Sequence, residues 1–123
     1  MLQRPLVAVI DDDESVRESL PDLLKVLGFA ARAFASAKEF LDSDCVADAR
    51  CLILDINMPG TSGPELQREL IRQRYAISTI FITALSSPSI PEDLLAQGAV
   101  QCLLKPFNRE DLRAALEAAL ARA

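Results

Sequence analysis

Acidic side chains follow two of the most apolar stretches of this 123-residue chain. The run Leu6–Ile10 ends at the three acids Asp11–Asp13. The run Cys51–Leu54 ends at Asp55. Unbroken apolar runs of this length are typical of strands buried on both faces of a parallel sheet, and α/β proteins place their sites at the carboxyl ends of such strands. The acids are therefore expected at the mouth of a site.

The chemistry of such a cluster depends on whether the two strands are neighbours. If they are, Asp11, Asp12 and Asp55 converge. At an effective dielectric constant of about 20, two carboxylates roughly 4 Å apart repel by about 4 kcal/mol, so the cluster needs a cation or a proton. Mg²⁺ suits it, because that ion binds through few carboxylates and keeps positions for water and substrate oxygens. Asp55, at the centre, can act as a nucleophile and form an aspartyl phosphate.

Two further polar residues are expected at the same edge of the sheet. Thr83 ends an apolar stretch that begins at Ser78, and Lys105 follows the stretch Ala99–Leu104. A hydroxyl and an ammonium group can both bind phosphoryl oxygens. Because phosphoryl transfer is catalysed mainly by positioning and charge neutralisation, these groups fit that reaction.

Five repeats of strand and helix are predicted to position these residues. We expect strands at about residues 6–10, 29–34, 51–55, 78–83 and 99–104, and helices at about 14–27, 36–41, from 62, 91–98 and from 108. Right-handed crossovers turn this pattern into a doubly wound parallel sheet of the flavodoxin-like (βα)5 type with strand order 2-1-3-4-5. That order makes the first and third strands neighbours, as the acid cluster requires.

Local signals refine these helices. Capping boxes are predicted at Ser36–Glu39 and Ser62–Glu65. A kink is expected at Pro21, which removes a backbone donor inside the first helix. The helix after Ser62 should carry Leu66, Leu70 and Ile71 inward, and the last helix should bury Leu112, Ala115, Leu116, Ala119 and Leu120. Residues 42–50 are predicted to form a polar link.

Composition excludes several classes of function. The chain has no histidine, so it can hold no Ser-His-Asp triad, histidine zinc ligand or phosphohistidine of its own. The net charge is −5 without a basic patch, which disfavours direct binding of nucleic acid. No apolar run approaches the length of a membrane span, and no signal peptide is recognised. Three widely spaced cysteines favour reduced thiols in a cytoplasmic protein, and the length favours a single domain over residues 1–123.

Four short motifs together resemble one family. The motifs are Ile10-Asp-Asp, Leu54-Asp-Ile-Asn-Met-Pro-Gly, Ile82-Thr-Ala and Leu104-Lys-Pro-Phe. In this order and spacing they resemble the receiver domain of bacterial two-component response regulators, over the whole chain. The stretches Val9–Arg17 and Ser36–Leu41 further resemble FixJ-type receivers, which usually precede a LuxR-type DNA-binding domain.

The resemblance implies a role for each acid. Asp55 is implied to accept a phosphoryl group from a sensor histidine kinase. Asp11, Asp12 and Asp55 are implied to hold Mg²⁺ together with the backbone carbonyl of Asn57. An attached or partner output domain, most simply one that controls transcription, is implied to read the result.

The resemblance also implies a switch. Thr83 is implied to move toward the phosphoryl group and Lys105 to pair with it, with a cis bond between Lys105 and Pro106, which costs only about 0.5–1 kcal/mol for an X-Pro bond. The family's switch aromatic is replaced here by Cys102, so the inward movement of a ring is expected to be weak or to be replaced by another packing change. For Cys102 itself we expect a buried thiol that packs as a small hydrophobe.

The signalling surface of the family lies on the last two helices and the strand between them. In this chain they correspond to residues 91–98, 99–104 and the helix after Asn108, and this surface is also a possible homodimer interface. Pro88 and Pro91 are expected to shorten the first of these helices and to alter the surface.

Three alternatives stay open at this point. The acids Asp11–Asp13 can simply favour a helix start, where negative charge interacts well with the helix dipole. The pattern Asp11-x-Asp13-x-Ser15 resembles the opening of haloacid-dehalogenase-type phosphatases, in which the first aspartate is phosphorylated. Finally, a receiver can work as an interaction module without phosphate, a reading that Cys102 favours.

Overall fold

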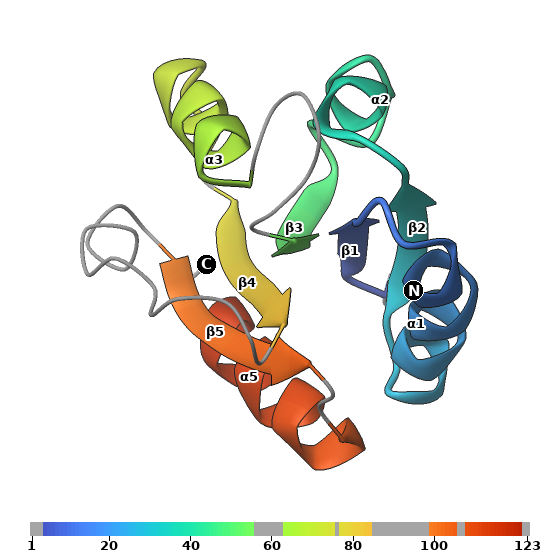
Figure 1. The fold of residues 1–123 in the computed structure, drawn as a ribbon. Helices are drawn as coiled ribbons and strands as arrows, with labels where there is room; N and C mark the ends of the chain where they lie inside the picture. The colour runs from blue at the N-terminus through green and yellow to red at the C-terminus, as the bar shows by residue number, and fades with distance from the viewer. Residues whose placement is uncertain (1–3, 56–62, 76, 85–98, 106–107, 122–123) are drawn as a thin grey trace.

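The computed structural model describes residues 4–55, 63–75, 77–84, 99–105 and 108–121. These residues form one five-stranded sheet in which every neighbouring pair of strands is parallel, in the order β2-β1-β3-β4-β5 (Figure 1). The strands are β1 Leu6–Ile10, β2 Ala30–Phe34, β3 Ala49–Asp55, β4 Ser78–Ala84 and β5 Ala99–Lys105. The predicted fold class and strand order are confirmed.

Helices cover both faces of the sheet (Figure 1). They are α1 Glu14–Val26, α2 Ala37–Leu41, α3 Gly63–Arg72 and α5 Arg109–Ala121. Buried residues of α2 and α3 pack in one core cluster, whereas those of α1 and α5 pack in a second cluster. The predicted helix at residues 91–98 lies outside the described residues.

The central strands supply both clusters because successive side chains of a strand point to opposite faces. In β1, Ala8 and Ile10 belong to the α2–α3 cluster, while Val7 and Val9 belong to the α1–α5 cluster. All four side chains are fully buried. This double burial explains why β1 shows no polar alternation.

Capping residues set the beginnings of helices α1 and α2. Asp13 caps α1 by accepting from the amide of Ser15, and Ser36 caps α2 by accepting from the amide of Glu39. The Glu39 carboxylate accepts in turn from the amide of Ala35. This completes the predicted capping box, except that the donor is the residue before the cap Ser36 and not Ser36 itself. Helix α1 continues through Pro21, and the kink at that residue stays a prediction.

Two local predictions are wrong. Ile71 is 49 % exposed, so α3 turns only Leu66 and Leu70 of the three predicted residues into the core. The segment 42–50 is also more than a polar link, because Cys45, Val46 and Ala49 are buried and β3 already begins at Ala49. The two apolar residues Cys45 and Val46 pack in the α2–α3 cluster.

Of the other two helix predictions, the one for α5 is confirmed and the one for the start of α3 is not tested. In α5, Leu112, Ala115, Leu116 and Ala119 are buried and Leu120 packs against the same cluster, as predicted. The capping box proposed before α3 rests on Ser62, which lies outside the described residues, so it stays a prediction.

Candidate metal and phosphoacceptor site

The parallel pairing of β1 with β3 brings three acids to one edge of the sheet. Ile10 is in register with Leu54, so the next residues, Asp11 and Asp55, leave the two strands side by side. Asp11 and Asp55 are buried, whereas Asp12 is exposed. One carboxylate oxygen from each of the three residues lies within 4.8 Å of the other two. The convergence on which the sequence argument rested is therefore present in the structure.

The cluster concentrates negative charge in a confined place. At separations of up to 4.8 Å and an effective dielectric constant of about 20, each pair of carboxylates repels by at least about 3.5 kcal/mol. A divalent cation would remove this repulsion and is attracted by it. The buried position of Asp11 and Asp55 strengthens both effects, because fewer water molecules screen the charges there.

The spacing of the oxygens fits Mg²⁺. Around an octahedral Mg²⁺, oxygens about 2.1 Å from the ion lie about 3.0 Å apart when adjacent and about 4.2 Å apart when opposite, and of three such oxygens only two can be opposite. The three oxygens, all within 4.8 Å of one another, are close enough for the side chains to turn onto one ion, directly or through a bridging water. Exposure of Asp12 leaves one side open to solvent, which suits an ion that keeps several water ligands.

Hydrogen bonds fix Asp11 from several directions. Its amide donates to the carbonyl of Phe34 at 3.1 Å, and its carboxylate Oδ1 accepts from the amide of Asp13 at 2.9 Å. Its carbonyl oxygen accepts from Nη1 of Arg17 at 2.9 Å. The residue is thus held by the neighbouring strand, by its own loop and by helix α1.

Asp13 has a different role from its two neighbours. Its carboxylate accepts from the amide of Ser15 at 2.9 Å and caps α1. The group of three converging acids does not include it. The helix-start alternative thus holds for Asp13, while Asp11 and Asp12 converge with Asp55.

For the other predicted site residues within the described ranges, the structure gives the position of the backbone in the sheet. Thr83 and Lys105 lie at the carboxyl ends of β4 and β5, where Thr83 is in register with Leu104 and Ala84 with Lys105. Both therefore reach the edge of the sheet at which β3 ends in Asp55. Cys102 lies within β5, in register with Phe81. Asn57 and Pro106 lie outside the described residues.

Sequence reasoning assigned no role to Arg17. The structure shows that its side chain reaches back from α1 to the end of β1. The available signal was its position four residues after the helix cap Asp13, one helical turn along, from which a long side chain can return to the preceding strand. Without the path of the loop, however, that position equally fits an arginine pointing into solvent.

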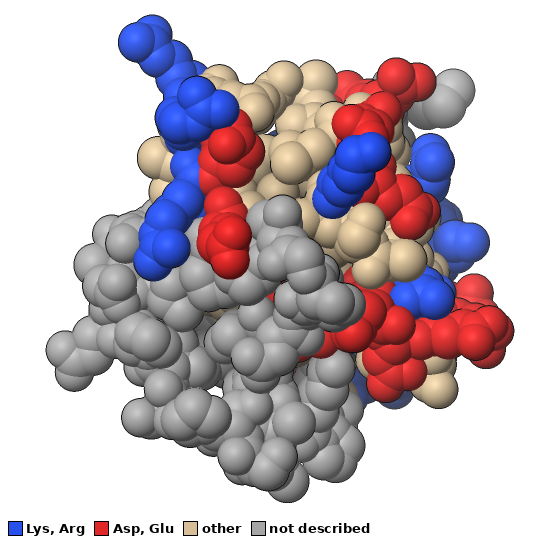
Figure 2. All heavy atoms as spheres, turned by 45° about the horizontal axis from the view of Figure 1, so that its top comes forward, with Lys and Arg blue, Asp and Glu red and all other residues tan. Residues whose placement is uncertain are grey.

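Charged side chains of both signs lie on the face shown in Figure 2. Over the described residues, Lys and Arg side chains lie near Asp and Glu side chains, and several Asp and Glu side chains gather at the lower right of the view. Among the helices that the structure describes, none is both long enough and apolar enough to cross a membrane.

The doubly wound five-stranded sheet, with its acids at the carboxyl ends of β1 and β3, defines a CheY-like α/β domain. Residues 7–117 match the model of the response regulator receiver domain. The chain belongs to this family. Its membership argues against the phosphatase alternative and confirms the resemblance of the four motifs.

The chain is also similar in sequence to named transcriptional regulatory proteins. The chain is 38 % identical over 115 residues to the transcriptional regulatory protein TdiR of Thauera aromatica, which covers 94 % of the chain and 51 % of the relative. It is 39 % identical over 116 residues to the transcriptional regulatory protein FixJ of Azorhizobium caulinodans, covering 94 % of the chain and 55 % of FixJ. The chain thus spans about half the length of these curated relatives.

Solved structures agree with the fold. The response regulator StyR superposes with a TM-score of 0.89 at 39 % identity, covering 98 % of this chain and 61 % of that chain. The structure titled FixJ-N superposes with a TM-score of 0.86 at 34 % identity, covering 99 % of this chain and 98 % of that one. The predicted likeness to FixJ-type receivers is confirmed.

Proposed function

We propose that this chain is a phosphoacceptor of two-component signalling, which takes a phosphoryl group from a sensor histidine kinase onto Asp55. The observation that carries the proposal is the meeting of the Asp11, Asp12 and Asp55 carboxylates within 4.8 Å. Membership of the receiver family supports it. Because the chain has no histidine, the donor imidazole must come from a partner.

The transfer places clear demands on the residues. A carboxylate oxygen of Asp55 attacks phosphorus, the bond from phosphorus to the donor imidazole breaks, and the released ring nitrogen takes up a proton from water. Asp11, Asp12, Asp55 and the Asn57 carbonyl would hold Mg²⁺, which supplies positive charge to the phosphoryl oxygens. Thr83 and Lys105 would bind the oxygens of the product and stabilise it.

The output follows from the rearrangement around that product. Movement of Thr83 toward the phosphoryl group would alter the signalling surface that the resemblance assigns to residues 91–98, 99–104 and the helix after Asn108, and with it contacts to a second copy or an output domain. Transcription is the most direct target, because TdiR and FixJ are named transcriptional regulatory proteins. The buried free thiols of Cys45 and Cys51 fit a reducing cytoplasm. We treat residues 1–123 as one receiver domain.

Incubation with acetyl phosphate and Mg²⁺, followed by intact mass measurement, tests the proposal. We expect the mass of one phosphoryl group on the unsubstituted chain and none on Asp55→Asn. Reduction of the acyl phosphate with borohydride and peptide mapping should place the label at Asp55. A label at Asp11 would instead support the phosphatase alternative, and normal Mg²⁺ binding without any phosphoryl gain would support the phosphate-independent receiver.

A further inference from the structure

Arg17 links helix α1 to the metal-binding edge of the sheet. Its Nη1 donates to the carbonyl oxygen of Asp11 at 2.9 Å, and its own amide donates to the carbonyl of Asp13 at 3.2 Å. The side chain is half-buried. The guanidinium and the backbone of Arg17 thus bond to the carbonyls at the two ends of residues 11–13.

This contact adds to other hydrogen bonds of Asp11. The amide of Asp11 is held by Phe34 and one carboxylate oxygen is held by the amide of Asp13. The bond from Arg17 has an ionised donor and the bond to the Asp11 carboxylate has an ionised acceptor, so both are charge-assisted, and such bonds are roughly twice as strong as neutral ones. Arg17 therefore adds a strong restraint from helix α1 to the one within the loop.

The acid cluster needs such a restraint. Three carboxylates held close together repel one another, and a loop free to move would relax by turning Asp11 or Asp12 away from Asp55. Because the carbonyl of Asp11 is tied to α1, the peptide that joins Asp11 to Asp12 cannot rotate freely. Both carboxylates then remain directed at the place where a cation would bind.

From this geometry we infer that Arg17 is a positioning residue for Mg²⁺, which holds the Asp11–Asp12 segment in its binding conformation before the ion arrives. The inference rests on the proposed function. Residues that support metal ligands from behind commonly contribute about tenfold or more to metal affinity, which sets the size of the expected effect.

Charge and position predict opposite results for Arg17→Met. Loss of a positive charge close to a cation site would by itself tighten Mg²⁺ binding. Loss of the restraint on Asp11 would weaken it. A weaker affinity therefore identifies positioning, and a simple charge effect cannot imitate it.

Lys25→Met is the matched control. Lys25 is exposed on the same helix, eight residues beyond Arg17 and so about 12 Å farther along the axis. Its substitution changes the net charge by the same amount without touching the loop. Arg17→Lys is the conservative variant, because its ammonium group can still donate to the Asp11 carbonyl.

The experiment is calorimetric titration of MgCl₂ into the full chain, with thermal melts to confirm folding. We expect Arg17→Met to weaken Mg²⁺ binding about tenfold, Arg17→Lys to recover part of the loss, and Lys25→Met to change affinity less than about twofold. Phosphorylation by acetyl phosphate should require correspondingly more Mg²⁺ in Arg17→Met and reach a similar rate at saturation.

Two outcomes would count against the inference in different ways. Unchanged or tighter Mg²⁺ binding in both folded Arg17 variants overturns the role of Arg17 and leaves the proposed function intact. Failure of the unsubstituted chain to bind Mg²⁺ overturns the proposed function and the role of Arg17 with it.

Discussion

Arg74 adopts after α3 the left-handed backbone conformation that Gly28 adopts after α1, with φ values of 66° and 100°. Both residues close their helix with the same pair of backbone bonds, 2.9–3.1 Å long. In each case the residue donates to the carbonyl three positions back, and the next residue donates to the carbonyl five positions before it. This is the Schellman arrangement, which favours glycine because other residues are strained at positive φ.

Arg74→Gly should therefore stabilise the protein. Relief of left-handed strain is worth about 1–2 kcal/mol, and the greater freedom of glycine in the unfolded chain offsets about 0.5–1 kcal/mol of it. Urea unfolding should show a higher midpoint by the equivalent of about 0.5–1 kcal/mol, with an unchanged slope.

Gly28→Ala is the reciprocal control. An added Cβ at Gly28 would meet no atom within 4 Å, so the cost comes from the backbone alone. We expect a net loss of about 0.5–1 kcal/mol, because the lower freedom of alanine in the unfolded chain offsets part of the strain. If Arg74→Gly destabilised the protein while Gly28→Ala behaved as expected, the Arg74 side chain would have to form contacts that outweigh the strain.

Leu70 and Ile71 are adjacent in α3 but differ in burial, at 2 % and 49 % exposed. Leu70→Ala should cost about 2–5 kcal/mol, because it leaves a cavity between the sheet and α3. Ile71→Ala should change the free energy of unfolding by less than about 1 kcal/mol, since much of its side chain already contacts water. Equal losses in chemical unfolding would show that Ile71 is buried in solution, for instance by self-association.

The same pair shows where sequence reasoning succeeds and fails. Leu66 and Leu70 lie four residues apart and mark the inner face of α3, but Ile71 is rotated by about 100° from Leu70 and falls at its border. Periodicity alone cannot say which side of the border is covered, because that depends on how closely the helix approaches the sheet. The structure places Ile71 on the outer side.

The sheet was predictable because its signals are redundant. The unbroken apolar runs before Asp11 and Asp55 identified two central strands, and the crossover rule made them neighbours. Their convergence follows from that order alone. The bond from Arg17 to Asp11 was not predictable, because it depends on the path of a three-residue loop and on one side-chain conformation.

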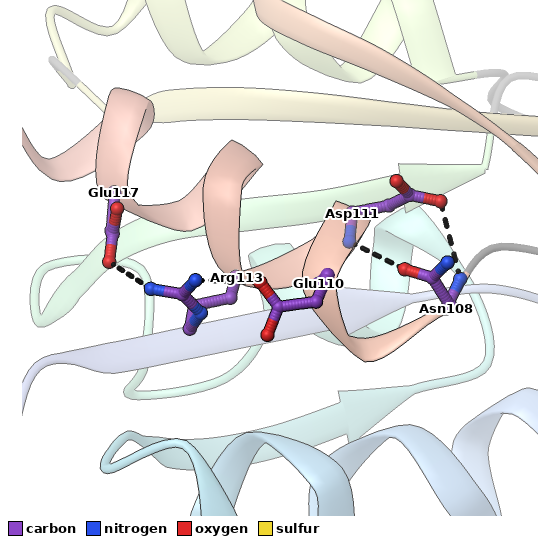
Figure 3. Close-up of polar contacts among 5 residues, drawn as sticks. All are labelled: Asn108, Glu110, Asp111, Arg113 and Glu117. Atoms are coloured by element: carbon purple, nitrogen blue, oxygen red, sulfur yellow. Dashed lines mark hydrogen bonds and ion pairs between the residues drawn. The ribbon is translucent and has the colours of Figure 1, made fainter.

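Two kinds of polar contact in and before α5 should differ in value (Figure 3). Asn108 and Asp111 form a reciprocal cap, in which the amide of Asp111 donates to Asn108 Oδ1 at 2.8 Å and the amide of Asn108 donates to Asp111 Oδ2 at 3.4 Å. Arg113 bridges Glu110 at 2.6 Å and Glu117 at 2.9 Å on the exposed surface. Hydrogen bonding by Arg113, followed by its charge, lowers the pKa of Glu110.

Asn108→Ala should cost about 1 kcal/mol of unfolding free energy at any ionic strength, because it leaves backbone donors of the first turn without a cap. Arg113→Ala should cost less, and its effect should disappear in about 1 M NaCl, where charges are screened within about 3 Å. Thermal melts at low and high salt measure both. A salt-dependent loss for Asn108→Ala, or a salt-resistant one for Arg113→Ala, would contradict this division.

Cys51 makes the free energy of unfolding depend on pH in the alkaline range. Its side chain is fully buried at the start of the central strand β3, and burial raises the pKa of the thiol from 9.0 to about 12. The folded chain therefore keeps this proton in a range where the unfolded chain loses it. The stabilisation is complete below pH 9, and it is lost progressively as the pH rises toward 12.

Comparison with Cys51→Ala isolates this effect from the other groups that titrate in the same range. The difference in unfolding free energy between the two proteins should be constant below pH 9. Above pH 9 the unsubstituted chain should lose stability relative to Cys51→Ala by up to about 1.4 kcal/mol per pH unit. Urea unfolding at a series of pH values gives both curves, with a reducing agent present to prevent oxidation of the thiols. Parallel curves across the whole range would mean that the thiol at residue 51 ionises as readily in the folded chain as in the unfolded one.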